Sequence, residues 1–129
     1  MQPTILIIDD SENDVLLTKA ALARTGQNFR TEVASSGEAG LLLIRGGKTP
    51  IKLILLDLKM PGMDGIEFLR KIRDDKNFSS IPVVIVTNSN LESDEQAAFK
   101  AGSNGFLHKA TDLGKLTKDF ERLLGLGWA

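Results

Sequence analysis

Short runs of aliphatic residues alternate along the chain with longer segments whose apolar positions recur at helical spacing. Five runs predict strands, because each is a short apolar stretch bounded by polar or turn residues. They cover residues 4–8, 29–34, 52–57, 81–86 and 105–109. The segments between them predict helices, at residues 14–24, 66–74, 92–101 and 112–124 and in the segment that carries Leu41 to Ile44.

The ends of the helical segments carry residues that start and stop helices. Ser11 precedes the first segment as an N-cap, and Gly26 ends it. Ser35 and Glu38 have capping-box spacing and open the second helix, which a pair of glycines ends. The chain therefore runs from strand to helix in a regular alternation.

The helices differ in how much apolar surface they offer to a core. The apolar positions at helical spacing are Leu16, Ala20 and Ala23 in the first helix, Phe68, Leu69 and Ile72 in the third, and Leu113, Leu116, Phe120, Leu123 and Leu124 in the last. The helix over residues 92–101 sets only a narrow stripe of small residues against its charges. Burial therefore stabilises this helix little, and it can shift at low cost.

Strands that alternate with helices over short loops predict a parallel sheet with helices on both faces and right-handed crossovers. With 129 residues, of which 42% are hydrophobic, the chain has the size of one domain, residues 1–129. The predicted fold class is a doubly wound α/β domain with a five-stranded parallel sheet.

The composition limits which cellular compartment and which classes of partner are expected. The 16 basic and 17 acidic residues give a net charge of −1, so there is no electrostatic footprint for nucleic acid or an anionic membrane. The absence of cysteine excludes disulfides, thiol catalysis and cysteine-ligated metals. No apolar stretch is long enough to span a bilayer, and no secretion signal is evident. We expect a cytoplasmic protein whose partners are proteins.

The stretch from Lys52 to Asp57 is an aliphatic strand that ends in one carboxylate, and the loop that follows it through Gly65 contains Pro61 and Gly62. Burying a carboxylate without a partner is costly, so Asp57 requires a hydrogen bond, a cation or a chemical role. The simple alternative to a chemical role is that Asp57 only caps the turn, because Asp is a common turn residue.

Four other polar residues end predicted strands. The strands of a parallel sheet point the same way, so their carboxyl ends gather at one edge, where ligands bind. This rule brings together Asp9, Asp10, Asp57, Thr87 and Lys109. Because turn statistics alone rarely give such a set, the group favours a functional Asp57.

The residue types of this group indicate a metal and a phosphoryl group. Crowded carboxylates repel one another unless they share a cation, and Mg²⁺ prefers oxygen ligands while leaving room for a phosphate. The ammonium of Lys109 and the hydroxyl of Thr87 are suitable partners for phosphoryl oxygens. Asp57 is then the candidate nucleophile, which attacks phosphorus to form an aspartyl-phosphate.

The chain resembles the receiver domains of two-component response regulators, of the single-domain chemotaxis or phytochrome-associated type. The resemblance covers nearly the whole chain. Its motifs are Ile5–Asp10, Leu55–Gly65, Val83–Thr87 and Gly105–Lys109. It implies a flavodoxin-like fold with strand order 2-1-3-4-5.

The resemblance also implies roles for individual residues. Asp57 would accept a phosphoryl group from a phosphohistidine on a sensor histidine kinase or phosphotransfer protein. The ligands of Mg²⁺ would be Asp9, through water, Asp10, Asp57 and the backbone carbonyl of Lys59. Thr87 and Lys109 would bind the phosphoryl oxygens, and Phe106 would be the aromatic residue that reorients as Thr87 closes in.

Three residues depart from the usual family pattern. Ala110 stands where Pro, often after a cis peptide, normally follows the active-site lysine, and a cis bond without Pro costs about 2.5–4 kcal/mol. Asn88 replaces a very small residue and narrows access to the site. Lys59 has a side chain that can reach the phosphoryl group or form a lid with Ser89. We expect an altered phosphoryl lifetime, in a direction that the sequence leaves open.

Three other functions are compatible with parts of the sequence. A flavodoxin-like cofactor binder needs a neutral phosphate loop after the first strand, where Asp9 and Asp10 would repel a phosphate. A phosphohydrolase with an Asp nucleophile needs a second acid two residues on, where Lys59 stands, so turnover of external substrates is not expected. A receiver that binds proteins without phosphorylation remains an alternative. His108, the only histidine, alternates away from Lys109 and is read as packing or surface.

We therefore expect a stand-alone receiver without an output domain, although a receiver excised from a longer chain would have the same sequence. Phosphorylation of Asp57 would draw Thr87, loosen the helix over residues 92–101 and let Phe106 move. The altered surface, formed by the fourth helix, the fifth strand and the fifth helix, would bind a downstream protein or a second copy of the chain.

Overall fold

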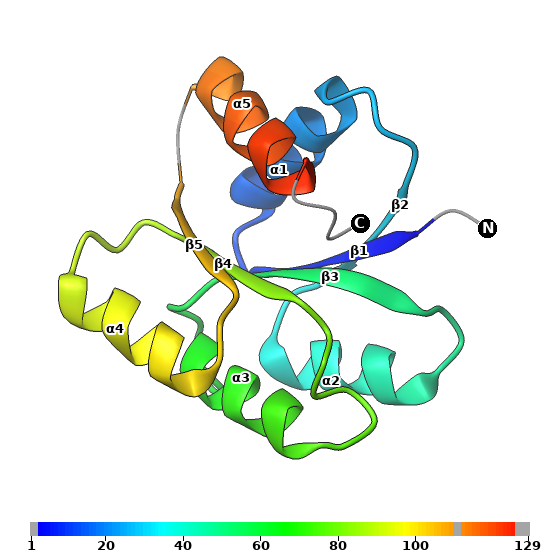
Figure 1. Cartoon of the computed structure of the whole chain (residues 1–129), viewed down its shortest axis with the longest axis vertical. Helices are drawn as coiled ribbons and strands as arrows, with labels where there is room; N and C mark the ends of the chain where they lie inside the picture. The colour runs from blue at the N-terminus through cyan, green and yellow to red at the C-terminus, as the bar shows by residue number, and fades with distance from the viewer. Residues whose placement is uncertain (1–2, 110–111, 126–129) are drawn as a thin grey trace.

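The computed structural model describes residues 3–109 and 112–125, which form five strands alternating with five helices (Figure 1). The strands are β1 Thr4–Ile8, β2 Arg30–Ala34, β3 Ile51–Leu56, β4 Val83–Thr87 and β5 Gly105–His108. The helices are α1 Glu12–Arg24, α2 Gly37–Gly46, α3 Gly65–Asp74, α4 Glu92–Ala101 and α5 Leu113–Leu124. Each predicted strand and helix is present, and the residue ranges stated for them differ from these by only one or two residues at either end.

The strands form one sheet in the order β2-β1-β3-β4-β5, and all neighbouring strands are parallel. The register pairs Ile8 with Leu56 and Leu56 with Ile85, so β1 and β3 end side by side. Backbone hydrogen bonds continue past the strand ends, since the Asp57 amide donates to the carbonyl of Ile8 at 3.0 Å. The predicted doubly wound fold is confirmed, and residues that follow different strands meet at one edge.

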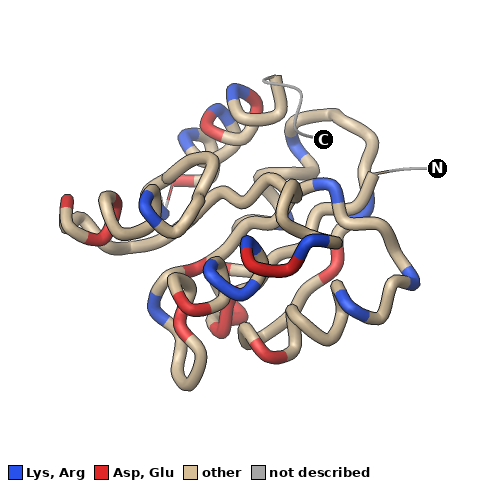
Figure 2. The backbone as a smooth tube through the Cα atoms, turned by 60° about the horizontal axis from the view of Figure 1, so that its bottom comes forward, with Lys and Arg blue, Asp and Glu red and all other residues tan. Residues whose placement is uncertain are grey.

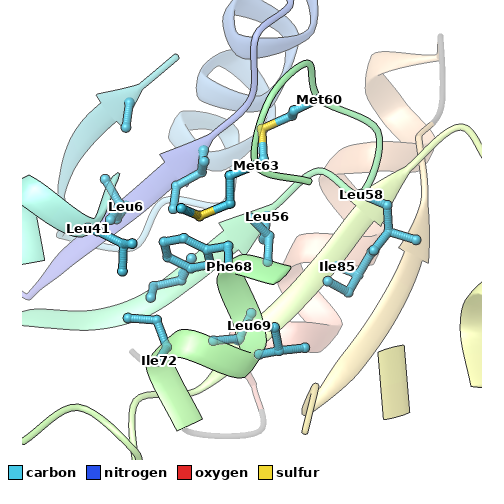
Figure 3. Packing of buried hydrophobic residues seen from close by; sticks show 14 of the residues in the cluster. Leu6, Leu41, Leu56, Leu58, Met60, Met63, Phe68, Leu69, Ile72 and Ile85 are labelled. Carbon is cyan, nitrogen blue, oxygen red and sulfur yellow. The ribbon is translucent and has the colours of Figure 1, made fainter. Parts of the chain in front are cut away.

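Helices cover both faces of the sheet, with α1 and α5 on one side and α2, α3 and α4 on the other (Figure 1). Side chains alternate along each strand, so Ile5 and Ile7 of β1 join the core under α1 and α5. Leu6 and Ile8 join the opposite core, where Phe68 lies at the centre of the packing (Figure 3). Because both faces are buried, the strands have nearly continuous aliphatic sequences.

Helix α1 packs on the sheet with a different face from the one that the spacing indicated. Leu16 is 65% exposed, and Ala20 and Ala23 are exposed as well. The buried residues of α1 are Thr18, Ala21 and Leu22. Apolar residues stand next to each other in this segment, so two stripes have similar apolar content. Contact with the sheet and with α5, not periodicity, decides which stripe is buried.

Helix α2 starts one residue later than the capping box indicated. The N-cap is Ser36, whose hydroxyl accepts a hydrogen bond from the Ala39 amide at 3.0 Å. This register turns Gly40 toward the sheet, where a Cβ atom would lie 2.7 Å from the Ile8 Cδ1 atom. The absence of a side chain at Gly40 therefore lets α2 approach β1 closely.

Helix α4 contributes little to the core, as the sequence predicted. Among its described residues only Ala98 is buried, while Phe99 is 55% exposed. Leu91 serves as the N-cap and provides no side-chain hydrogen bond. The first turn of α4 thus begins without a side-chain cap.

Charged positions are spread over the molecule. Figure 2 shows Lys and Arg positions interspersed with Asp and Glu positions along the helices and loops. In the part of the chain that the structure describes, no helix combines the length and the apolar character needed to cross a membrane.

Candidate functional site

The loop after β3 fixes the position of Asp57. It closes through a hydrogen bond from the Gly65 amide to the Leu58 carbonyl at 2.9 Å, and Gly62 adopts a positive φ of 76°. Met60 and Met63 turn inward from this loop and are buried in the core around Phe68 (Figure 3). The loop is therefore packed against the core, and Asp57 is held at the sheet edge.

Three of the strand-end residues are in direct contact. The Lys109 Nζ atom lies 2.9 Å from Asp9 Oδ2 and 3.4 Å from Asp57 Oδ2. The Lys109 side chain is only 11% exposed, and both carboxylates are buried. Ion pairs in such surroundings are screened by water much less than surface pairs. The structure thus brings Asp9, Asp57 and Lys109 together as the strand-end rule predicted.

Asp10 completes a group of acids suited to a cation. One oxygen from each of Asp9, Asp10 and Asp57 lies within 4.8 Å of the others. Asp10 is exposed whereas the other two acids are buried, so a bound ion would have protein oxygens on one side and solvent on the other. Such a set of oxygen donors fits a hard divalent cation, and Mg²⁺ in particular because it retains waters. The predicted acidic ligands therefore fit the metal.

The charges of the site influence one another. Burial raises the pKa of Asp57 above its ordinary value, Lys109 opposes this rise, and the charge of Asp9 adds to it. Burial alone would lower the pKa of Lys109, but the hydrogen bonds to Asp14 and Asp9, together with the charges of Asp57 and Asp9, outweigh burial and raise it. Lys109 is therefore held as an ammonium. Burial and the charge of Asp9 disfavour the ionised form of Asp57, and a bound cation would stabilise that form.

Asp14 is a site residue that the sequence analysis did not identify. It lies in the first turn of α1, and its Oδ2 atom accepts a hydrogen bond from Lys109 Nζ at 2.8 Å. An acid in a first helical turn is common because it suits the helix dipole, so its residue type gave no functional signal. Only the tertiary structure, which places the first turn of α1 beside Lys109 at the end of β5, reveals the contact.

Thr87 is the last residue of β4, and its side chain is buried. Its carbonyl accepts a hydrogen bond from the Lys109 amide at 2.7 Å. Its Oγ1 atom accepts one from the Ser89 amide at 3.3 Å. The structure therefore links Thr87 to Lys109 through the main chain and to the loop before α4 through its side chain.

Comparison with known proteins identifies the family. Residues 5–121 match the family described as the response regulator receiver domain. The chain belongs to this family. Together with the observed strand order, this finding confirms the predicted family and fold.

The relatives of this receiver include both short and long proteins. It is 30% identical over 123 residues to a chemotaxis protein CheY homolog of Campylobacter jejuni, covering 95% of this receiver and 93% of that protein. It is 34% identical over 112 residues to a probable cyclic di-GMP phosphodiesterase of Vibrio cholerae. The matched region covers 87% of this receiver but only 24% of that protein.

Two solved structures have closely similar folds. The Mn(2+)-bound form of response regulator Rcp1 has a TM-score of 0.83 and 29% identity, covering 94% of this receiver and 91% of that chain. The phosphorylated cyanobacterial phytochrome response regulator RcpA has a TM-score of 0.86 and 26% identity, covering 95% and 91% of the two chains.

Lys59 points away from the acidic group in this receiver. Its side chain is 67% exposed, and its Nζ atom lies 3.3 Å from the Oδ2 atom of Asp94 in the first turn of α4. The Ser89 hydroxyl donates a hydrogen bond to the same oxygen. These contacts lower the pKa of Asp94, the bond from Ser89 most of all. Asp94 is a second residue that the sequence analysis missed, and it joins Lys59 to Ser89.

An open hollow of about 400 Å³ lies beside this contact. Its lining residues are Lys59, Asn88, Ser89, Asn90, Leu91 and Asp94. Asn88 is exposed at this hollow, so the predicted effect of its size on access stays a prediction. Ala110 lies outside the described residues.

Phe106 is half-buried on β5 and packs against the core between the sheet and α3. Its ring meets the His108 ring edge to face, with centroids 5.7 Å apart and planes at 76°. His108 therefore lies on the side of β5 opposite to Lys109, and its observed contact is with an aromatic ring.

Proposed function

We propose that this receiver is a phosphoacceptor, in which Asp57 takes a phosphoryl group from a phosphohistidine on a sensor histidine kinase or phosphotransfer protein. The observation that carries the proposal is the contact of Lys109 with Asp57 and Asp9 inside a three-carboxylate group. An ammonium and acidic metal ligands around one buried carboxylate are the groups that phosphoryl transfer needs. The phosphorylated state of RcpA, a structural relative, supports the proposal.

The residues of the site would take different roles in phosphoryl transfer. A carboxylate oxygen of Asp57 forms a bond to phosphorus while the phosphorus–nitrogen bond of the donor breaks and the imidazole leaves with the electron pair. Lys109 donates to the developing negative charge on the phosphoryl oxygens, and Thr87 provides a hydroxyl partner at the end of β4. The ligand set for Mg²⁺ would be Asp9, Asp10, Asp57 and the Lys59 carbonyl. When bound, Mg²⁺ would neutralise charge on the acids and the phosphoryl group.

The proposed output is a change in the surface formed by α4, β5 and α5. Helix α4 buries only Ala98 among its described residues, so moving it exposes little apolar area. Thr87 is linked by its side chain to Ser89, which bonds Asp94 of α4. A movement of Thr87 toward a phosphoryl group would reach α4 along this path, and Phe106 would reorient on β5. The changed surface would bind a downstream protein or a second copy of the receiver.

Phosphorylation is tested by intact-mass measurement after treatment with acetyl phosphate and Mg²⁺. The native protein should gain the mass of one phosphate, and Asp57→Asn should gain none. Asp64→Asn is a matched control, because Asp64 caps α3 on the outside of the loop. An unmodified native protein, or an equal gain in Asp57→Asn, would contradict the phosphoacceptor role and leave the alternative of a receiver that only binds proteins.

The switch has its own test. Beryllium fluoride with Mg²⁺ mimics a phosphoryl group, and amide exchange should then change at α4 and at Phe106. It should not change in α2, which packs on β1 and β2, toward the edge of the sheet opposite to β5. Size-exclusion chromatography of the same samples shows whether the receiver forms a dimer. Identical exchange profiles with and without the mimic would argue against the proposed surface. We expect no turnover of added phosphate esters in either state.

A further inference from the structure

Lys109 is surrounded by three carboxylates. Its Nζ atom lies 2.8 Å from Asp14 Oδ2, 2.9 Å from Asp9 Oδ2 and 3.4 Å from Asp57 Oδ2. A lysine ammonium has three N–H donors, so three acceptors satisfy it completely. A phosphoryl oxygen can bind Lys109 only by replacing one of them.

The three carboxylates differ in what else they must do. Asp9 and Asp57 belong to the acidic group that fits a cation, and Asp57 is the proposed phosphoacceptor. Their oxygens would therefore be shared with other partners during the reaction. Asp14 is not part of this group, and it makes the shortest of the three contacts to Lys109.

The position of Asp14 is fixed by a closed ring of contacts. The Ser11 amide donates to Asp9 Oδ1 at 3.0 Å, and the Asp14 amide donates to Ser11 Oγ at 3.3 Å. The Asp14 carboxylate accepts from Lys109 Nζ, which also contacts Asp9 Oδ2 and so closes the ring. The N-terminus of α1 and the end of β5 are thus tied together around Lys109.

We propose that Asp14 is a positioning residue for Lys109, the one partner that the ammonium keeps while its contacts to Asp9 and Asp57 are exchanged for phosphoryl oxygens. This proposal rests on the phosphoacceptor function. Without Asp14, the ammonium would lose its shortest contact and would have no fixed partner while Asp9 and Asp57 bind the cation and the phosphoryl group. Asp14 therefore holds the ammonium close to Asp57 while its contacts to Asp9 and Asp57 are exchanged.

The first test measures the position of Lys109 without metal or phosphoryl group. The rate at which each lysine is acetylated by a small reagent is read by peptide mass spectrometry. Asp14→Ala should label Lys109 about fivefold faster, because one hydrogen bond to a charged group is lost. Lys115, which pairs with Asp119 on α5, should label at an unchanged rate. Unchanged labelling of Lys109 would overturn the proposal.

The second test measures binding of beryllium fluoride in saturating Mg²⁺. Asp14→Ala should weaken binding about tenfold, and Asp14→Asn should recover most of the loss because its amide oxygen accepts from Lys109. In a Lys109→Met background, Asp14→Ala should have no further effect, since Asp14 acts through Lys109. Glu12→Ala removes the same charge from the same helical turn, and an equal loss there would show a general charge effect instead.

The outcomes separate the two proposals. A native protein that gains no phosphate refutes the phosphoacceptor function, whatever Asp14 does. A native protein that gains phosphate, together with Asp14→Ala that binds the mimic as tightly as the native protein, refutes the positioning role alone. If Asp14→Ala does not fold, Asp14→Asn decides the proposal through its Lys109 labelling rate, which should lie between the native rate and that of denatured protein.

Discussion

Gly65 is the position where one added methyl group should disturb both the fold and the site. A Cβ atom at Gly65 would lie 2.5 Å from the Asp57 carbonyl oxygen and 2.8 Å from the Leu58 Cα atom. Non-bonded carbon atoms are most stable at about 3.5–4.0 Å, so Gly65→Ala requires the backbone of the loop to move by roughly 1 Å. Both neighbours are main-chain atoms and cannot rotate away.

The expected loss follows from these contacts. Overpacking costs about 1–3 kcal/mol, and the upper end applies because the obstacle is backbone. Alanine regains up to about 1 kcal/mol of helix propensity at the start of α3. The free energy of unfolding should therefore fall by about 2 kcal/mol, which lowers the melting temperature by about 8 °C in a domain of this size.

Thermal unfolding of Gly65→Ala beside Gly46→Ala measures the effect. Gly46 also lies in a helix, but a Cβ atom there meets nothing within 4 Å, so its substitution should be neutral or slightly stabilising. Amide spectra should show the largest shifts of Gly65→Ala at Asp57 and Leu58. A melting temperature equal to that of the native protein, or shifts that avoid Asp57, would refute this reasoning.

Three further predictions concern the charges. Burial raises the pKa of Asp57, so the folded state binds the Asp57 proton more tightly than the unfolded chain does. Asp57→Asn should therefore raise the melting temperature of the metal-free protein at pH 7. This gain in melting temperature should vanish as the pH falls to 3.8. Arg73 donates to backbone carbonyls at 2.8 and 2.9 Å, so Arg73→Ala should cost about 2 kcal/mol in urea titrations, whereas Arg70→Ala on the exposed side should change little. Lys59→Ala should speed amide exchange in the first turn of α4 by no more than about fivefold and leave the melting temperature unchanged. The reason is that an exposed ion pair such as Lys59–Asp94 contributes less than about 1 kcal/mol. A large loss of global stability would contradict this prediction.

The sequence alone determined the order of the elements and the residues at their ends. Strand and helix periods are local properties, and Pro, Gly and capping residues mark their boundaries within a few positions. Once the strands are parallel, their carboxyl ends must share one edge, which is why Asp9, Asp57 and Lys109 could be grouped before any contact was known.

Only the tertiary structure decided which helix faces meet the sheet and which side chains join the strand ends. In α1 the periodic residues Leu16 and Ala20 face solvent, because neighbouring apolar residues offered a second stripe that fits the sheet. The same rotation turns Asp14 toward Lys109. Asp94 likewise reaches Lys59 across a long separation in the chain. Such contacts depend on helix rotation and long-range packing, which a local pattern does not encode.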